Sequence, residues 1–275
     1  MGAEEFGIVM RFLLVIFLSI AGSAHAQGIA EGIDLDSNVG RISIVETGDD
    51  FSRVLQVDGR RFFEDDAYRY VSVVAQFGEF YLISLSSGGT NCGAEYVWLN
   101  TSHAAPIFSD LFGNCSDLWE ASIDGGRFTV ILPAVSAADG YVAFVYDGQI
   151  IEKVALGQRS AGIGLTADDW IGHRPGSIFR DADWRETLIA LMGEGGYKLA
   201  GDVIAVGSGF EIQGDWVAGA GFNRRMVGHN HGAVAVNRTD GRVVVALQTD
   251  EAGLQIWGDI AGSVPEAIEG INHRH

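Results

Sequence analysis

A series of short apolar segments with a period of two fills the chain from Arg41 to Ala155 and constrains its fold more than any other feature. In a β-strand successive side chains point to opposite faces, so this alternation is typical of strands with one buried face. Turn-forming Asp-Gly and Ser-Gly steps separate the segments, and none keeps a helical period over the length of a helix. The sequence therefore predicts an N-terminal all-β module, an antiparallel sandwich or barrel. The expected strands are Arg41–Glu46, Tyr70–Phe77, Phe80–Leu85, Glu95–Leu99, Arg127–Leu132, Tyr141–Tyr146 and Ile150–Ala155.

Cys92 and Cys115, the only two cysteines of the chain, both lie within this β-rich region. Their spacing matches neither a CxxC redox motif nor a zinc site, and in an exported protein such a pair is usually oxidised. We therefore predict one structural disulfide. Closing a loop of this size stabilises a fold by roughly 3 kcal/mol.

The start of the chain has the pattern of an export signal. Met10 and Arg11 precede the apolar run Phe12–Ile20, and the small-residue stretch Ala21–Ala26 follows it. The run is shorter than the about 20 apolar residues that a membrane anchor needs. We expect residues 1–26 to be a signal peptide cleaved before Gln27, which predicts a periplasmic protein with no membrane span in the mature chain.

The charge balance is strongly acidic, with a formal net charge of −18. Such a field repels nucleic acid and anionic lipid and speeds the encounter with basic proteins. The same charge also keeps an exported protein soluble, so by itself it leaves the partner open. We expect a basic protein partner and no nucleic acid.

The composition changes at residues 157–176, where glycines gather in a pattern that suits a linker. After them, Trp184, Leu188, Leu191 and Met192 stand at helical spacing, with Asp181 or Asp183 as the N-cap and Gly193 as the stop. A second short helical stretch is expected at 197–203, and a terminal helix from Pro265. Between them the sequence predicts the strands Phe210–Gln213, Trp216–Gly221, Gly232–Asn237, Arg242–Gln248 and Leu254–Trp257. This order predicts two domains, an acidic all-β module over 27–156 and an α+β domain over 177–275, in which helices flank an antiparallel sheet.

The C-terminal part, over about residues 178–271, resembles the periplasmic inhibitor of vertebrate lysozyme. The resemblance rests on the opening Phe179-Arg180-Asp181-Ala182-Asp183-Trp184-Arg185, the strand Trp216–Gly221 leading into a loop, and the blocks Asp240-Gly241-Arg242 and Gln255-Ile256-Trp257-Gly258. It implies an α+β fold and a protein partner. In that family a protruding loop of the form Cys-Lys-Pro-His-Asp-Cys, closed by its own disulfide, presents a histidine to the active site of a lysozyme.

The equivalent stretch here, residues 222–227, departs from the family pattern. Phe222 and Val227 replace the two cysteines, Arg224 replaces the proline and Arg225 replaces the histidine. The predicted partner-binding residues of the loop and its flanks are Asn223, Arg224, Arg225, His229 and His231. Arginine can form bidentate bonds with the carboxylate pair of a lysozyme cleft. Alternatively, the two arginines are solvated surface, and without the loop disulfide the ability to inhibit is in doubt.

No complete catalytic constellation stands in the sequence. The glycines beside Ser208 have the wrong spacing for a nucleophile elbow, and paired carboxylates such as Asp168-Asp169 lie in polar turns. His229 and His231 have no further ligand at metal-site spacing. We therefore expect no enzyme, no cofactor and no metal. The resulting hypothesis is an exported periplasmic binding protein that inhibits a c-type lysozyme or binds a cell-wall-related protein; the alternative is a non-inhibitory structural or assembly module of the cell envelope.

Overall fold

The computed structural model describes residues 34–47, 52–63, 68–88, 92–223, 230–260, 262 and 264–271. Antiparallel β-sheet dominates, since 48% of the described residues are strand and 17% are helix. The antiparallel β structure that the sequence predicts is thus confirmed. Residues 1–26, the predicted signal peptide, lie outside the described residues.

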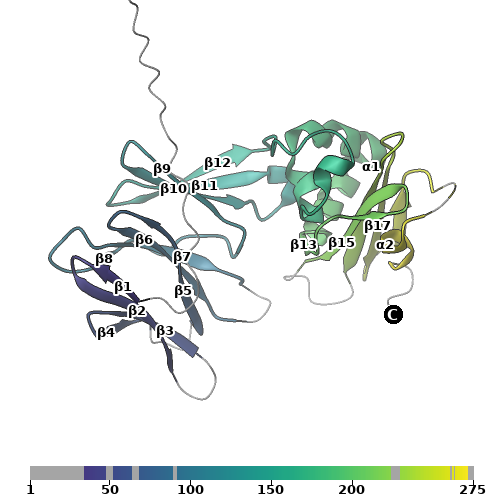
Figure 1. Cartoon of the computed structure of the whole chain (residues 1–275). Coiled ribbons are helices and arrows are strands. Elements are labelled where there is room, and N and C mark those ends of the chain that lie inside the picture. Colours follow the sequence, from purple (N-terminus) through teal and green to yellow (C-terminus); the bar gives the residue numbers. More distant parts are fainter. Residues whose placement is uncertain are drawn as a thin grey trace, which may run out of the picture.

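Three four-stranded sheets form the N-terminal half, and in each of them strands that follow one another in sequence pair as antiparallel neighbours (Figure 1). The first sheet contains β1 (Asp34–Ser37), β2 (Gly40–Thr47), β3 (Ser52–Val57) and β4 (Arg60–Phe62). The second contains β5 (Tyr70–Phe77), β6 (Phe80–Ser86), β7 (Glu95–Asn100) and β8 (Ile107–Phe108). The third contains β9 (Glu120–Asp124), β10 (Arg127–Pro133), β11 (Tyr141–Tyr146) and β12 (Ile151–Gly157).

The second sheet, β5–β8, lies between the other two and is buried on both faces. On one face Ile83 and Leu99 pack in a core with Leu55 of the first sheet. On the other face Leu82 and Trp98 share a core with the third sheet. Strands covered on both sides form near-continuous apolar runs, as in β7, instead of alternating patterns. The N-terminal half is therefore a stack of three β layers, whereas the sequence predicts a sandwich or a barrel.

The fourth sheet has the order β13-β15-β16-β17-β18, and β14 also pairs with β15. Its strands are β13 (Val206–Gly207), β14 (Glu211–Gln213), β15 (Trp216–Phe222), β16 (His231–Asn237), β17 (Val243–Thr249) and β18 (Gly253–Trp257). Alternate residues of these strands point to opposite faces. The valines of one face form a core with α1 (Ala182–Val203), and the alanines of the other pack against α2 (Glu266–Glu269) and Ile271. The helices thus cover both faces of the sheet (Figure 1).

The helix α1 is broken at Gly193, whose backbone angles (φ 73°, ψ 166°) are not helical. Asp181 is its N-cap, because its carboxylate accepts a hydrogen bond from the backbone N–H of Asp183 at 2.8 Å. The sequence prediction of two helical stretches separated by Gly193 agrees with this geometry. Among the described residues, the helices are all too short or too polar to cross a lipid bilayer.

Three short 3-10 helices accompany the sheets: η1 (Ala137–Asp139), η2 (Asp168–Trp170) and η3 (Pro175–Arg180).

The N-terminal and C-terminal halves share buried contacts. Ala137, in the connection between β10 and β11, is fully buried in the C-terminal core, where its methyl group faces Gly201 of α1. The segment 157–176, whose composition suggests a linker, adds the fully buried Trp170 to the same core.

Candidate functional site

The disulfide that the sequence predicts joins Cys92 to Cys115. It ties the start of the β7 segment to the chain after β8. Beside it, the backbones of Tyr96 and Phe112 exchange two hydrogen bonds of 2.7 and 2.9 Å, and the Tyr96 hydroxyl donates to the carbonyl of Ser116 at 2.8 Å. The segment 112–118 is therefore fixed against β7 by covalent and hydrogen bonds.

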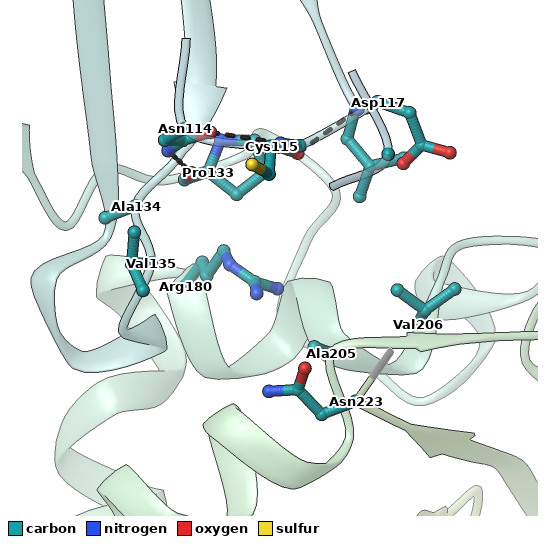
Figure 2. A pocket seen from close by; sticks show the side chains of 13 residues that line it. Asn114, Cys115, Asp117, Pro133, Ala134, Val135, Arg180, Ala205, Val206 and Asn223 are labelled. Carbon is teal, nitrogen blue, oxygen red and sulfur yellow. Dashed lines mark hydrogen bonds between the residues drawn. The ribbon is translucent and has the colours of Figure 1, made fainter. Parts of the chain in front are cut away.

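This segment forms one wall of a pocket between the two halves of the chain. Residues 114–118 and 133–135 line it from the N-terminal half, and Arg180, Ala205, Val206 and Asn223 line it from the C-terminal half. Figure 2 shows the guanidinium of Arg180 between these two walls. The cavity measures about 80 Å³.

Arg180, the last residue of η3, is only 5% exposed. Its Nη1 donates to the carbonyl of Gly176 at 2.7 Å, and its buried Nε has no hydrogen-bond partner. Within the part of the chain that the structure describes, no carboxylate lies within ion-pairing distance of this guanidinium. A buried charge is costly unless it is paired and hydrogen-bonded, so this side chain is the least satisfied charged group of the pocket.

Gly176 explains how η3 reaches this position. A Cβ on Gly176 would lie 2.4 Å from the carbonyl oxygen of Ile204 and 2.7 Å from that of Ala205. Only glycine lets the backbone of η3 come this close to the chain that leaves α1. The close approach turns the Gly176 carbonyl toward Arg180 and holds the guanidinium at the pocket.

The electrostatic surroundings of Arg180 compensate its charge only in part. Burial lowers the pKa of its guanidinium, and the nearby Tyr141, Asp202 and Tyr197 act in the opposite direction. Asp202 is the carboxylate of this group, and burial raises its own pKa above the ordinary aspartate value. One of its oxygens accepts the N–H of Ala137 at 3.2 Å. Asp202 therefore contributes a partly buried negative charge near Arg180 but makes no ion pair with it.

Two asparagine amides are fixed on opposite walls of the pocket. Asn114 donates its Nδ2 to the carbonyl of Pro133 at 2.6 Å, and Asn223 donates its Nδ2 to the carbonyl of Asp202 at 2.6 Å. The first bond joins the disulfide segment to the end of β10. The second ties the residue after β15 to the end of α1, so the root of the β15–β16 connection is part of the pocket wall.

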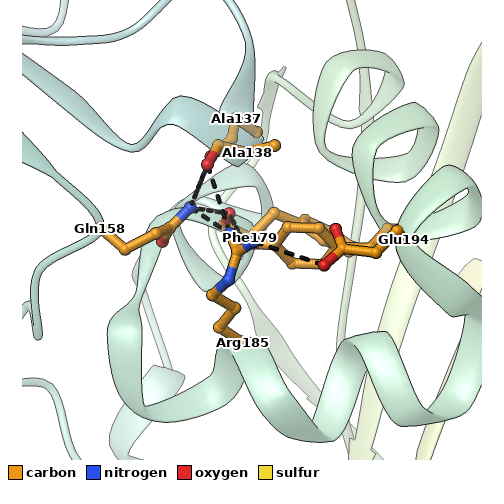
Figure 3. A network of polar contacts seen from close by, with 7 residues as sticks. Ala137, Ala138, Gln158, Phe179, Arg185 and Glu194 are labelled. Atoms are coloured by element: carbon orange, nitrogen blue, oxygen red, sulfur yellow. Dashed lines mark hydrogen bonds and ion pairs between the residues drawn. The ribbon is translucent and has the colours of Figure 1, made fainter.

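A polar network around the carbonyl of Phe179 connects the two halves of the chain (Figure 3). Gln158, just after β12, donates its Nε2 to the carbonyl of Ala137 at 2.8 Å and to the hydroxyl of Tyr197 at 3.0 Å. The Tyr197 hydroxyl in turn donates to the carbonyl of Phe179 at 2.7 Å. Because Phe179 precedes Arg180, this network fixes the position from which the arginine side chain extends.

Comparison with known protein families, curated proteins and solved structures finds no match.

The predicted partner-binding residues lie around the connection between β15 and β16. Asn223 lies in the pocket wall. His231 is half-buried in the first rung of β16, where it pairs with Phe222 of β15. Arg224, Arg225 and His229 lie outside the described residues. The flanking strands thus bring Asn223 and His231 to one end of the sheet, as expected for the two sides of a hairpin.

Within the described ranges, His, Cys, Asp and Glu side chains form no group of three or more that is placed to hold a metal ion. Asp168 and Asp169, the paired carboxylates after the third sheet, have separate structural partners. Asp168 accepts two bonds from Arg238, at 2.6 and 3.0 Å, and Asp169 accepts from the hydroxyl of Thr166 at 2.6 Å. Both interactions lower the pKa of the carboxyl concerned, so this pair lacks the divergent pKa values that acid/base catalysis uses.

Sequence reasoning missed the central residue of the pocket. Arg180 stands in the opening motif of the C-terminal part, where an arginine between Phe179 and Asp181 suggests an exposed cation beside a helix cap. The only available signal is the Pro175-Gly176 step four residues before it, because a glycine directly after a helix-starting proline can mark a close backbone approach.

Proposed function

We propose that this protein is an exported periplasmic binding protein that holds a basic protein partner at the β15–β16 end of its C-terminal sheet. In this proposal the chain has two domains, an acidic all-β module and an α+β domain similar to lysozyme inhibitors. A c-type lysozyme or another cell-wall-related protein is the partner. The export pattern of residues 1–26 and the Cys92–Cys115 disulfide are consistent with an oxidising compartment.

The observation that carries the proposal is the rung between Phe222 and His231. It makes residues 223–230 the direct connection between two neighbouring antiparallel strands of the sheet. This is the place that the family resemblance gives to the inhibitory loop. The hydrogen bond from Asn223 to Asp202 anchors one side of this connection to α1. An anchored loop root lowers the conformational entropy lost on binding.

The charge distribution supports a basic partner that carries a local acidic site. The whole chain has a net charge of −18, whereas Arg224 and Arg225 place two cations next to each other in the connection. A basic lysozyme is attracted by the overall field. Its pair of catalytic carboxylates is the chemistry that two arginines recognise. The acidic chain therefore attracts the basic lysozyme at long range, and the two arginines of the loop bind its carboxylates at short range.

The test is a binding measurement by biolayer interferometry between the exported chain and hen lysozyme, together with a turbidity assay of cell-wall lysis. We expect saturable binding whose association rate falls as salt rises, since salt screens the attraction. We also expect slower lysis at excess protein. Unchanged lysis together with saturable binding would favour the alternative of a non-inhibitory envelope module. Absence of binding at low salt would refute the choice of partner.

A double variant of the loop, Arg224→Glu with Arg225→Glu, separates the loop from the overall field. The matched control reverses Arg60 and Arg61, a neighbouring exposed pair on β4 of the first sheet. Both variants change the net charge equally. The loop variant should lose at least tenfold in affinity, whereas the β4 variant should bind at least as well as the unmodified chain. Equal effects of the two variants would mean that the loop makes no specific contact.

A further inference from the structure

The pocket between the two halves contains an incompletely satisfied cation. Arg180 is 5% exposed, and its Nη1 donates a hydrogen bond to the Gly176 carbonyl. Its buried Nε has no partner. The nearest compensating carboxylate, Asp202, is engaged by the backbone of Ala137 and forms no ion pair with the arginine. Such an arrangement favours the entry of an anionic group that supplies the missing acceptor oxygens.

The size of the cavity limits what can enter. A single buried water needs roughly 10–15 Å³ of such space, and drug-sized ligands occupy sites of about 300 Å³ or more. At about 80 Å³ the pocket has room for a small acidic group and the atoms next to it. Val135, which is 65% exposed, lines the pocket and marks its opening to solvent.

The charges around the cavity determine which anion it can hold. One guanidinium balances one negative charge. Asp117 is also part of the wall, and the chain has a net charge of −18. A phosphate dianion would therefore keep an uncompensated charge inside an acidic protein. A carboxylate carries one charge, and its two oxygens match the planar fork of arginine.

We propose that the pocket between the two halves binds a single carboxylate group through the guanidinium of Arg180. A small organic acid or the C-terminus of a peptide presents this carboxylate. The close approach at Gly176 and the hydrogen bonds of Tyr197 and Asn114 hold the walls of the site without a ligand. Such preorganisation reduces the entropy lost when the ligand is held. This site is separate from the proposed contact with a lysozyme and does not depend on it.

The test follows the arginine Nε–Hε signals of the ¹⁵N-labelled exported chain by NMR, with the Arg180 signal assigned by its loss in Arg180→Lys. Acetate, N-acetylalanine, N-acetylalaninamide, phosphate and chloride are titrated at constant ionic strength. We expect saturable shifts of the Arg180 signal with acetate and N-acetylalanine. Phosphate should bind at least tenfold more weakly, and the amide and chloride should not give saturable shifts. A capped tripeptide with a free C-terminus distinguishes the two sources: at least tenfold tighter binding than acetate indicates a peptide terminus, and similar binding indicates a small acid.

The variants are read from the backbone amide signals of residues 114–118. Arg180→Lys keeps the charge and loses the planar fork, so it should bind N-acetylalanine at least tenfold more weakly. Arg41→Lys, on the exposed surface of β2 in the first sheet and outside the pocket wall, should bind normally. If Arg180→Lys does not fold, the backbone amide signals of residues 114–118 in the unmodified chain decide the question. Shifts that are linear in acetate and equal to those with chloride mean that the pocket holds only water, and this result overturns the proposal.

Discussion

Gly176→Ala tests whether the packing of η3 depends on the close approach of its backbone to the chain that follows α1. The new methyl group would lie 2.4 and 2.7 Å from the carbonyl oxygens of Ile204 and Ala205. These distances are well inside van der Waals contact, and backbone oxygens cannot rotate away. Overpacking of this kind costs about 1–3 kcal/mol. The lower conformational entropy of unfolded alanine offsets about 0.4–1 kcal/mol of it.

We therefore expect Gly176→Ala to lower the free energy of unfolding by about 1–2 kcal/mol, which follows from these two contributions. In a chain of this size the melting temperature should fall by about 2–8 °C. The assay is urea unfolding followed by tryptophan fluorescence, with a thermal melt as a second measurement.

The matched control is Gly195→Ala. Gly195 lies in α1, and a Cβ there would meet no atom within 4 Å. Since alanine is the better helix former, this variant should gain up to about 1 kcal/mol. The same chemical change is thus expected to have opposite signs at the two positions. A Gly176→Ala variant as stable as the unmodified chain would refute the packing described for η3 and Arg180.

Three further outcomes follow from the fold. Replacing Cys92 and Cys115 together by serine should lower the free energy of unfolding, measured in urea, by about 3 kcal/mol. Reductant should destabilise the unmodified chain by the same amount and should not affect the variant. Gly193→Ala should cost about 1–3 kcal/mol, because the φ of 73° and ψ of 166° suit only glycine and no atom lies within 4 Å of the new methyl group; a neutral result in the same assay would mean that the break in α1 is dispensable. Burial raises the pKa of the Asp202 carboxyl. The folded protein is therefore stabilised by this group below the ordinary aspartate pKa, and that stability is lost as pH rises through the raised value. Asp202→Asn should remove this pH dependence of the free energy of unfolding, and an unchanged pH dependence would contradict the effect.

The strands were largely predictable because their alternation is a local property of the sequence. The expected strands Tyr70–Phe77 and Tyr141–Tyr146 coincide with β5 and β11. The third layer of the N-terminal half was not predictable in the same way. β7 is apolar on both faces, and a short continuous apolar run does not reveal how many layers cover it.

The pocket was even less accessible to sequence reasoning. Its walls come from segments that are distant in the sequence, among them residues 114–118 and Asn223. An arginine is normally read as a surface residue. The burial of Arg180 depends on the packing of η3 against the chain after α1, which no local pattern encodes. Only the root of the β15–β16 connection was expected near a binding site, and there the structure places Asn223.

The contact between Ala137 and Gly201 limits how the chain can be cut into separate fragments. A Cβ on Gly201 would lie 2.4 Å from the Cβ of Ala137, so α1 has a recess that a methyl group from the other half fills. A fragment beginning after residue 157 would leave that recess open to water, and Gln158 would lose the Ala137 carbonyl that accepts from its amide. Transplanting the C-terminal sheet into another protein would therefore require the β10–β11 tip to travel with it, or a larger side chain at position 201 to replace the missing methyl group.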